Sequence, residues 1–456
     1  MNLPNYFIAD LPSEAVLTPG MMTEACQTLK RNRAQYLADR ATPALIRRLS
    51  GVAENWLQPD YPFRKLALER GPNATGFSTA TLSAGLDAFF RQVTAENLRS
   101  LIVQELGHVQ RLDSLSATSA ESAALRAALV SGPEFLVHIA AGSLPNPVFM
   151  SIILGLLTRS AQFVKCATGA SFLPRLFAHS LYEADAKLGA CLEIAEWRGG
   201  STHLEEALFA EADCVTAMGS DETLTKIRHH LPVKTRFLGY GNRVSFGYIA
   251  HEALSGFNPQ KIAARAATDV VAWNQLGCLS PHVIYVEHGG ALTGEQFAEM
   301  LAVELARIEQ LAPRGELPPE SAAVIASKRA FYEIRVAHAL GTRQWISENS
   351  TAWTVIYEAD PRFQLSCLNR FIYVKGVSNL TEALQSADSV RGQVSTIGLA
   401  ATEDKAPALV TELARWGVTR VCPLGQMQNP PLLWRHDGRP ALGDLVTWTD
   451  WELGDN

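Results

Sequence analysis

The sequence predicts an α/β protein with a parallel, doubly wound sheet followed by a second α/β domain. Short apolar runs of strand length alternate with helical patterns across residues 134–237, and the same texture returns across residues 256–428. This alternation is typical of parallel sheets, because each parallel connection needs a crossover helix. Polar or glycine-containing turns at Gly142-Ser143, Lys165 and Gly219-Ser220 follow three of these runs. Doubly wound sheets bind ligands at such strand ends, so we expect a nucleotide-type pocket there.

The first sheet is predicted within residues 1–255, behind a helical flank. Apolar residues recur at helical spacing over residues 18–38 and 81–109, and the Ala-, Leu- and Glu-rich residues 114–129 also favour a helix. The predicted strands are residues 134–140, 162–165, 191–195, 214–217 and 234–237, and the helices between them are residues 147–158, 172–190, 205–208 and 223–230.

The second α/β domain is predicted within residues 256–428, and a tail follows at residues 429–456. Its predicted helices are residues 259–273, 293–312 and 319–340, and its strands are residues 282–287, 354–357, 371–374, 395–399 and 420–423. The tail contains Trp434, Trp448 and Trp451. Because exposed tryptophans are costly, we expect the tail to pack back on the body or against another subunit.

Composition excludes several classes of protein. The 40 Lys and Arg residues against 46 Asp and Glu residues give a net charge of −6, which argues against nucleic-acid binding by phosphate neutralisation. The longest nearly apolar run, residues 148–157, falls far short of the ~20 residues that span a bilayer. The seven cysteines contain no C-x-x-C pair, and the N-terminus has no signal-peptide pattern. We therefore expect a cytoplasmic protein with reduced thiols and no transmembrane segment.

Several familiar catalytic motifs are absent. The sequence contains neither G-x-x-x-x-G-K-[ST] nor G-x-S-x-G. His251-Glu252 begins like a zinc-protease motif, but Ser255 stands where the second histidine would be. Gly239-Tyr240-Gly241 lacks the rest of a dinucleotide fingerprint, since Val244 stands at the third glycine. No metal site is expected.

Cys278 is the residue whose local context points to chemistry. A predicted helix ends near Gly277 and a strand begins after Pro281, so the thiol lies at an element end between the two predicted domains. Gly277 would let the backbone turn tightly, and it places a small residue beside the sulfur. A thiolate with a nearby backbone N–H is what nucleophilic acyl chemistry requires. The local context alone leaves a buried, inert cysteine as the commoner alternative.

Ordered landmarks give the chain a resemblance to a known family. They are Ala-Gly-Ser-Leu-Pro at residues 141–145, Phe-Val-Lys at 163–165, Ala-Met-Gly-Ser at 217–220, Arg-Phe-Leu-Gly-Tyr-Gly at 236–241, Asn-Gln-Leu-Gly-Cys at 274–278, Gly-Val-Thr-Arg at 417–420 and His-Asp-Gly at 436–438. With these, the chain from about residue 100 onward resembles the aldehyde dehydrogenase superfamily, and within it the LuxC family of acyl-CoA reductases. The resemblance implies a Rossmann-type cofactor domain and a second α/β catalytic domain.

The resemblance implies roles for individual residues. Cys278 matches the nucleophile of the superfamily, and Lys165 matches the lysine that contacts the adenosine ribose of the cofactor. Gly219 and Ser220 match the turn that contacts the pyrophosphate. From the residues alone, Lys165 is also readable as a solvated surface lysine, and Gly219-Ser220 as an ordinary turn and helix cap.

Three positions depart from the superfamily pattern. Ser143 stands where an asparagine usually donates to the oxyanion, and Asn146 is the alternative donor. Leu238 replaces the glutamate that activates water in hydrolytic relatives, so a thioester intermediate should be protected from hydrolysis. Thr168 replaces the glutamate that repels a 2′-phosphate in many NAD-preferring members, which permits NADPH without excluding NADH.

The resemblance implies a reductase that converts a fatty acyl-CoA or acyl-protein thioester into an aldehyde, with NADPH favoured over NADH. The intermediate would be a thioester on Cys278. A hydrolytic or CoA-acylating aldehyde dehydrogenase, a cysteine-dependent acyltransferase and a non-catalytic scaffold remain alternatives. The family also implies a homo-oligomer and an acyl-activating synthetase as partner.

Overall fold

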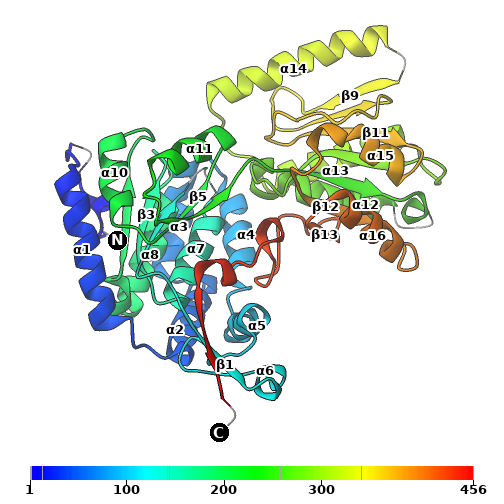
Figure 1. Cartoon of the computed structure of the whole chain (residues 1–456). Helices are drawn as coiled ribbons and strands as arrows, with labels where there is room; N and C mark the ends of the chain where they lie inside the picture. The colour runs from blue at the N-terminus through cyan, green and yellow to red at the C-terminus, as the bar shows by residue number, and fades with distance from the viewer. Residues whose placement is uncertain are drawn as a thin grey trace. The chain divides into compact units, whose positions relative to one another are not determined.

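The chain forms two compact units in its computed structural model (Figure 1). The structure describes residues 3–12, 14–140, 142, 144–255, 259–339 and 341–454. Unit 1 comprises Met1–Thr75, Leu86–Gly241 and Pro431–Asn456, and unit 2 comprises Gly76–Gly85 and Asn242–Pro430. Within the described residues, no helix is long and apolar enough to cross a membrane.

Unit 1 is built on a five-stranded parallel sheet with the strand order β4-β3-β2-β5-β6. The strands are β2 (Phe135–Ile139), β3 (Ala161–Cys166), β4 (Leu192–Glu196), β5 (Cys214–Met218) and β6 (Arg236–Tyr240). Every residue of β2 and β3 is buried, as expected for parallel strands covered on both faces. The chain runs outward from β2 in both directions, so the topological switch point lies between β2 and β5.

Helices cover both faces of this sheet. α1 (Pro19–Tyr36) and α10 (Thr202–Ala210) pack on one face, where apolar side chains of both helices join those of β2 and β3. α7 (Asn146–Leu157) and α8 (Phe172–Ala184) contact the sheet strands and the N-terminal helices α2 and α3. The other helices that lie in unit 1 are η1 (Ile8–Asp10), α2 (Thr42–Leu57), α3 (Pro62–Thr75), α5 (Ala95–Leu106), α6 (Ser119–Ala123), α9 (Ala186–Gly189), α11 (Asp221–His230), η5 (His436–Gly438) and η6 (Gly443–Leu445), while α4 (Thr79–Phe90) runs from one unit into the other.

A two-stranded antiparallel sheet corrects the helix expected over residues 114–129. Only α6 is helical there, and β1 (Arg126–Ser131) pairs with β14 (Thr447–Glu452) near the C-terminus. β1 is a strand because a partner more than 300 residues away supplies its hydrogen bonds, which overrides the local helix propensity. The tail therefore pairs with unit 1, yet Trp448 and Trp451 remain 41% and 52% exposed.

Unit 2 is built on a seven-stranded sheet with the order β13-β12-β7-β8-β11-β10-β9, parallel except for the antiparallel edge strand β9. The strands are β7 (Val244–Ile249), β8 (Pro281–Glu287), β9 (Thr342–Ile346), β10 (Thr354–Glu358), β11 (Phe371–Val377), β12 (Val394–Ala400) and β13 (Arg420–Pro423). β7 was not expected from the sequence. Because it pairs with β8 and β12, residues 242–255 lie in unit 2 and not in the first domain.

Two apolar clusters pack on opposite faces of the unit 2 sheet. One contains side chains of α12 (Pro259–Val271) and α13 (Gly294–Leu311). The other contains side chains of α14 (Pro319–His338), α15 (Leu380–Ser386) and α16 (Ala406–Trp416). The short helices of this unit are η2 (His251–Leu254), η3 (Ala272–Gln275) and η4 (Asp388–Val390). The sheet is thus covered by helices on both faces, as in doubly wound proteins.

Candidate active site

Cys278 lies between η3 and β8, at the amino end of a central strand of unit 2. It is the only exposed residue between positions 273 and 286, and Gly277 and Leu279 on either side are buried. The sequence left open whether this thiol is buried and inert. The structure places it at the surface of unit 2, where a reagent or substrate can reach it.

The other six cysteines are poorly reactive by comparison. Four are buried and two are partly buried. Burial raises the pKa of the Cys26, Cys166 and Cys191 thiols to about 12, and that of the Cys214, Cys367 and Cys422 thiols to about 11. Only about 0.1% of a thiol with a pKa of 11 is ionised at pH 8, and the thiolate is the nucleophile.

We expect iodoacetamide at pH 8 to alkylate Cys278 at least about 100-fold faster than any other cysteine, because Cys278 is exposed and the others are held as thiols. Peptide mass spectrometry over a time course measures each rate in the folded protein. In urea the seven rates should converge. Equal rates in the native protein would contradict the selective accessibility of Cys278.

The segment that precedes Cys278 has an unusual backbone. Trp273, Asn274 and Gln275 have φ values of 50°, 51° and 66°, in the left-handed region that side chains other than glycine rarely adopt. Each such residue costs about 1–2 kcal/mol, so the surrounding structure must hold the segment in place. Trp273 is buried, with its ring centre 5.2 Å from that of Phe77, and its indole fills the space where a side chain at Gly85 would project.

A second left-handed segment holds the first. Leu368, Asn369 and Arg370 have φ values of 61°, 57° and 65°. The Asn369 N–H donates to the Asn274 carbonyl at 3.0 Å, and Arg370 Nε donates to Asn274 Oδ1 at 3.1 Å. Residues 273–275, which precede Cys278, and residues 368–370 therefore hold each other in their left-handed conformations.

Gln275 fixes this arrangement with a fully buried side chain. Its Nε2 donates to the carbonyls of Pro281 at 2.7 Å and Phe371 at 2.9 Å, and to Ser366 Oγ at 3.3 Å. Its Oε1 accepts the Phe371 N–H at 2.9 Å. The amide of Gln275, three residues before Cys278, thus joins the start of β8 to the start of β11.

Gly277 and Ser245 shape the cysteine's own backbone. We expected Gly277 to supply a tight turn, but its φ is not positive. Its missing side chain instead permits close packing, since a Cβ there would lie 2.3 Å from Gln428 Nε2. Ser245 Oγ, on β7, donates to the Cys278 carbonyl at 2.7 Å and accepts the Thr396 N–H at 3.2 Å.

In unit 1, Lys165 lies near the carboxyl end of β3 and is 5% exposed. Its Nζ lies 5.7 Å from the centre of the Trp197 ring, and burial lowers the pKa of Lys165 below its ordinary value. Among the described residues, no hydrogen bond or ion pair engages the ammonium. Lys165 is therefore a buried lysine at the edge where parallel sheets bind ligands, and not a solvated surface lysine.

Gly219 and Ser220 follow β5 at the same edge, on one side of the switch point. Ser220 caps α11, because its Oγ accepts the Thr223 N–H at 3.2 Å. Asp221 and Glu222 occupy the first helical turn. The serine therefore has a structural role, and a pyrophosphate at this turn would face two carboxylates.

Thr168 is exposed in the turn after β3, and Leu238 is 6% exposed on β6. The N–H groups of Gly169 and Ser171 in that turn donate to the carboxylate of Glu196, at 2.7 Å and 3.2 Å. A carboxylate therefore lies against this turn even though Thr168 carries none. Leu238 presents no proton acceptor.

Ser143 lies outside the described residues. Asn146, the alternative oxyanion donor, is the first residue of α7, and its Oδ1 is buried without a hydrogen-bond partner among the described residues. The side-chain oxygen is thus not committed to holding the fold together. A small cavity of about 60 Å³ lies nearby in unit 1, lined by Pro145 and by residues 169–170 and 172–174 among others.

The sequence profile of one family, described as acyl-CoA reductase (LuxC), matches residues 37–448. The chain belongs to the LuxC family. Curated relatives of this LuxC-family chain are named long-chain acyl-protein thioester reductases. The protein of Vibrio harveyi is 24% identical over 320 residues, which cover 69% of this chain and 64% of the relative. The protein of Aliivibrio fischeri is 25% identical over 328 residues, which cover 69% and 63%. The match therefore spans less than two thirds of these relatives' length.

Solved structures similar to this LuxC-family chain are aldehyde dehydrogenases. An indole-3-acetaldehyde dehydrogenase of P. syringae, solved with NAD⁺, matches with a TM-score of 0.69 at 15% identity, over 96% of this chain and 89% of that one. An NAD-dependent benzaldehyde dehydrogenase of Corynebacterium glutamicum matches with a TM-score of 0.66 at 13% identity, over 95% and 91%. The chain has the aldehyde dehydrogenase fold, as the sequence predicted.

One group in the LuxC-family chain has the donor types of a metal site. Among the described residues, ligand atoms of His251, Glu252 and Glu287 lie within 4.8 Å of one another, at the carboxyl ends of β7 and β8. However, Glu287 approaches Nδ1 of the ring at 3.3 Å, and Glu252 approaches Nε2 at 3.4 Å. One ion can use only one ring nitrogen, whereas the two carboxylates approach different nitrogens of the ring, so the group is arranged as an imidazole between two carboxylates.

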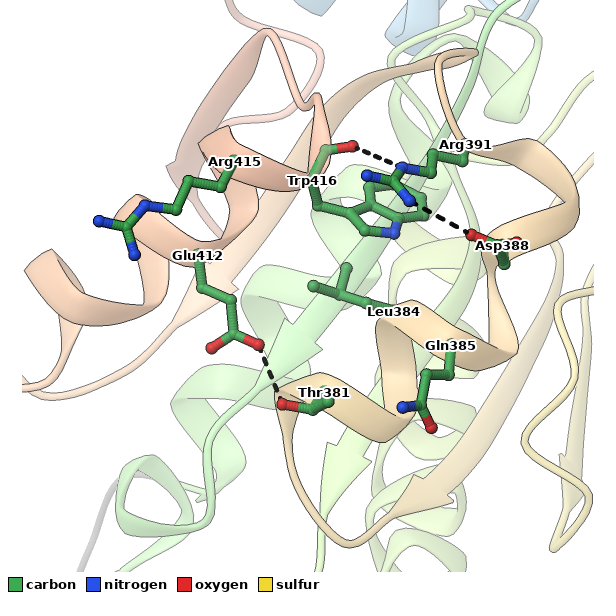
Figure 2. A pocket seen from close by; sticks show the side chains of 8 residues that line it. All are labelled: Thr381, Leu384, Gln385, Asp388, Arg391, Glu412, Arg415 and Trp416. Atoms are coloured by element: carbon green, nitrogen blue, oxygen red, sulfur yellow. Dashed lines mark hydrogen bonds and ion pairs between the residues drawn. The ribbon is translucent and has the colours of Figure 1, made fainter.

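Figure 2 shows a surface groove of about 540 Å³ between α15, η4 and α16 of the LuxC-family chain. Thr381 Oγ1 donates to Glu412 at 3.0 Å, and Arg391 Nε donates to the Trp416 carbonyl at 3.3 Å. The first bond joins α15 to α16, and the second joins the residue after η4 to the end of α16. None of the residues predicted as site residues lines it: its lining comprises Thr381, Leu384, Gln385, Asp388, Arg391, Glu412, Arg415 and Trp416.

Sequence reasoning missed the residues that support Cys278. Gln275 contributes to the sequence prediction only as part of a landmark, although a glutamine in an apolar context three residues before the cysteine signals a buried polar role. Ser245 and Gln428 gave no local signal, because Ser245 bonds the Cys278 carbonyl from a neighbouring strand and Gln428 bonds Ser280 from a distant loop.

Proposed function

We propose that this protein reduces a long-chain acyl thioester, on CoA or on a protein, to the aldehyde through a thioester on Cys278. The proposal rests on one observation: in a chain of the LuxC family, the one exposed cysteine thiol, Cys278, follows the left-handed residues 273–275. The curated relatives' names supply the substrate class. In this proposal unit 1 binds the cofactor and unit 2 carries the nucleophile.

Two features of unit 1 support our proposal of a nicotinamide dinucleotide as the cofactor. The Lys165 ammonium is buried, uncommitted among the described residues and placed at the carboxyl edge of a parallel sheet. Strands β2 and β5 flank the switch point, where such sheets bind dinucleotides. We propose Lys165 and Thr168 for the adenosine ribose, Gly219 and Ser220 for the pyrophosphate, and NADPH as the preferred cofactor, with NADH allowed.

The chain's own groups account for the acyl-transfer half of the cycle. The Cys278 thiolate attacks the thioester carbonyl, and its backbone N–H stabilises the oxyanion, with Ser143 or Asn146 as the proposed second donor. The substrate thiolate leaves and is protonated, which leaves the acyl group on Cys278. When bound, the reduced nicotinamide supplies the hydride. Carbon–sulfur cleavage then releases the aldehyde and restores the Cys278 thiolate.

The test of this function is direct. The protein is incubated with NADPH or NADH and a panel of acyl-CoAs, and aldehyde and acylated peptides are measured by mass spectrometry. We expect long-chain aldehyde, and an acyl adduct on Cys278 when the cofactor is omitted. An adduct with no reduction would favour an acyltransferase, and carboxylic acid as product would favour a hydrolytic enzyme.

Leu238→Glu should raise the ratio of carboxylic acid to aldehyde by about tenfold or more, because it restores a carboxylate at the position matched to the water-activating glutamate. The ratio is measured by product analysis with acyl-CoA and NADPH. Leu238→Gln has the same shape without a base and should leave the ratio near the wild-type value. An unchanged ratio in a folded Leu238→Glu protein would contradict the assignment of Leu238.

We also propose a homo-oligomer in which β14 contributes to the contact, and an acyl-activating synthetase as donor of the acyl group. All six residues of β14 are exposed, Trp448 and Trp451 among them, although the strand pairs with β1. Exposed aromatic side chains on an edge strand are typical of a surface that a partner covers.

A further inference from the structure

A short loop of unit 2 is held from both sides by buried charges. Asp269, on α12, is 1% exposed, and its carboxylate accepts the N–H groups of Gly425 at 2.5 Å and Met427 at 2.8 Å. Arg420, on β13, is 8% exposed, and its guanidinium donates to the carbonyls of Gln426 at 2.9 Å and Met427 at 2.7 Å. Residues 425–427 are therefore fixed at both their donor and acceptor groups.

Burying these two ionisable side chains costs free energy. Taking a carboxylate and a guanidinium out of water has a large cost, and burial raises the pKa of Asp269 to about 7. The apolar neighbours of the loop would hold it roughly in place, since Leu424 and Met427 are both buried in the unit 2 core. Two buried ionisable side chains, from α12 and β13, thus bond the backbone of one loop and restrict its position closely.

Gln428, which follows residues 425–427, contacts the residues around Cys278. Gln428 Nε2 donates to Ser280 Oγ at 2.5 Å. The same amide lies over Gly277, where a Cβ would come within 2.3 Å of Nε2 and 2.8 Å of Oε1. Gln428 thus touches the residue before Cys278 and the second residue after it, and all of these residues lie in unit 2.

We propose that Gln428 is a positioning residue that fixes the orientation of the Cys278 backbone and thiol during acyl transfer, and that Asp269 and Arg420 hold Gln428 in place. The inference rests on the proposed function. Ser245, on β7, already bonds the Cys278 carbonyl. Gln428 supplies a second restraint, because it bonds Ser280, two residues after Cys278. An oxyanion donor acts only when its N–H points at the developing charge, and misplacement by about 1 Å can cost about 100-fold.

The test separates orientation of the thiol from its mere accessibility. Gln428→Met keeps the length of the side chain but removes its hydrogen bond to Ser280. We expect single-turnover acylation of Cys278 by hexadecanoyl-CoA to slow about tenfold or more, while iodoacetamide alkylation of Cys278 changes less than about threefold. Alkylation needs only a reachable thiolate, whereas acyl transfer needs the oxyanion geometry. NADPH binding should be unchanged.

Ser280→Ala removes the same hydrogen bond from the other side, so the Gln428→Met/Ser280→Ala double variant should be no slower than either single variant. Asn429→Ala is the matched control, because this neighbouring amide bonds Gln426 and not the cysteine segment. Acylation at the wild-type rate in Gln428→Met, or an equal loss of acylation and alkylation, would overturn the proposal. Aldehyde formation by Cys278→Ala would instead overturn the proposed function, whatever Gln428 does.

Discussion

Replacing Cys278 with alanine should reduce aldehyde formation from an acyl thioester by at least about 10,000-fold, while the dissociation constant for NADPH stays within about twofold of the wild-type value. The proposed cycle has no second nucleophile, because the other six cysteines are buried or partly buried and burial raises their pKa values to about 11–12. The cofactor residues we propose lie in unit 1, and Cys278 lies in unit 2. The substitution should therefore abolish the reaction without weakening NADPH binding.

The measurements are aldehyde formation by mass spectrometry and NADPH binding by fluorescence titration. Cys367→Ala is the matched control, since Cys367 is a partly buried cysteine of the same unit, and it should retain activity within about threefold. A Cys278→Ala protein that still forms aldehyde would contradict the covalent mechanism. Loss of NADPH binding together with activity would point to disruption of the fold.

The parallel strands of unit 1 were predictable because most of them are short, mainly apolar runs between helical patterns. Residues 134–140, for example, become β2 (Phe135–Ile139), in which every residue is buried. β1 and β7 were not predictable in this way. β1 is rich in alanine and forms a strand only because it pairs with β14. β7 is a buried central strand, but it contains Ser245 and Gly247, which are not typical of such a strand.

The candidate site was predictable only as a position. The pattern before Pro281 located Cys278 at an element end, and the resemblance to a family gave it a role. The sequence could not reveal the support beneath it. Gln275 bonds to Phe371, 96 residues away, and Gln428 bonds to Ser280, 148 residues away. Hydrogen bonds between distant residues depend on the assembled sheet, and no local periodicity records them.

Gln275→Leu should lower the free energy of unfolding of unit 2 by about 3–5 kcal/mol, the largest stability effect that we expect near the site. The side chain is fully buried and takes part in four hydrogen bonds, to Pro281, Ser366 and twice to Phe371. A buried hydrogen bond contributes about 1 kcal/mol, and a buried polar group left without a partner costs about 1–3 kcal/mol. Leucine has a similar volume, so the loss is one of hydrogen bonding and not of packing.

Because the backbone at this position is left-handed, the substitution should also change the local conformation. At a φ of 66°, Gln275 is held in a strained conformation by the bonds that its side chain makes to the starts of β8 and β11. Without them, residues 273–275 should relax toward an ordinary helix end and carry Cys278 with them. Urea unfolding measures the stability, and hydrogen exchange of the amides of β8 and β11 localises the change to unit 2. Gln385→Leu, at an exposed glutamine on α15, should change stability by less than about 0.5 kcal/mol. If Gln275→Leu were as mild as this control, the strained segment would have to be held by Asn274 and Arg370 alone.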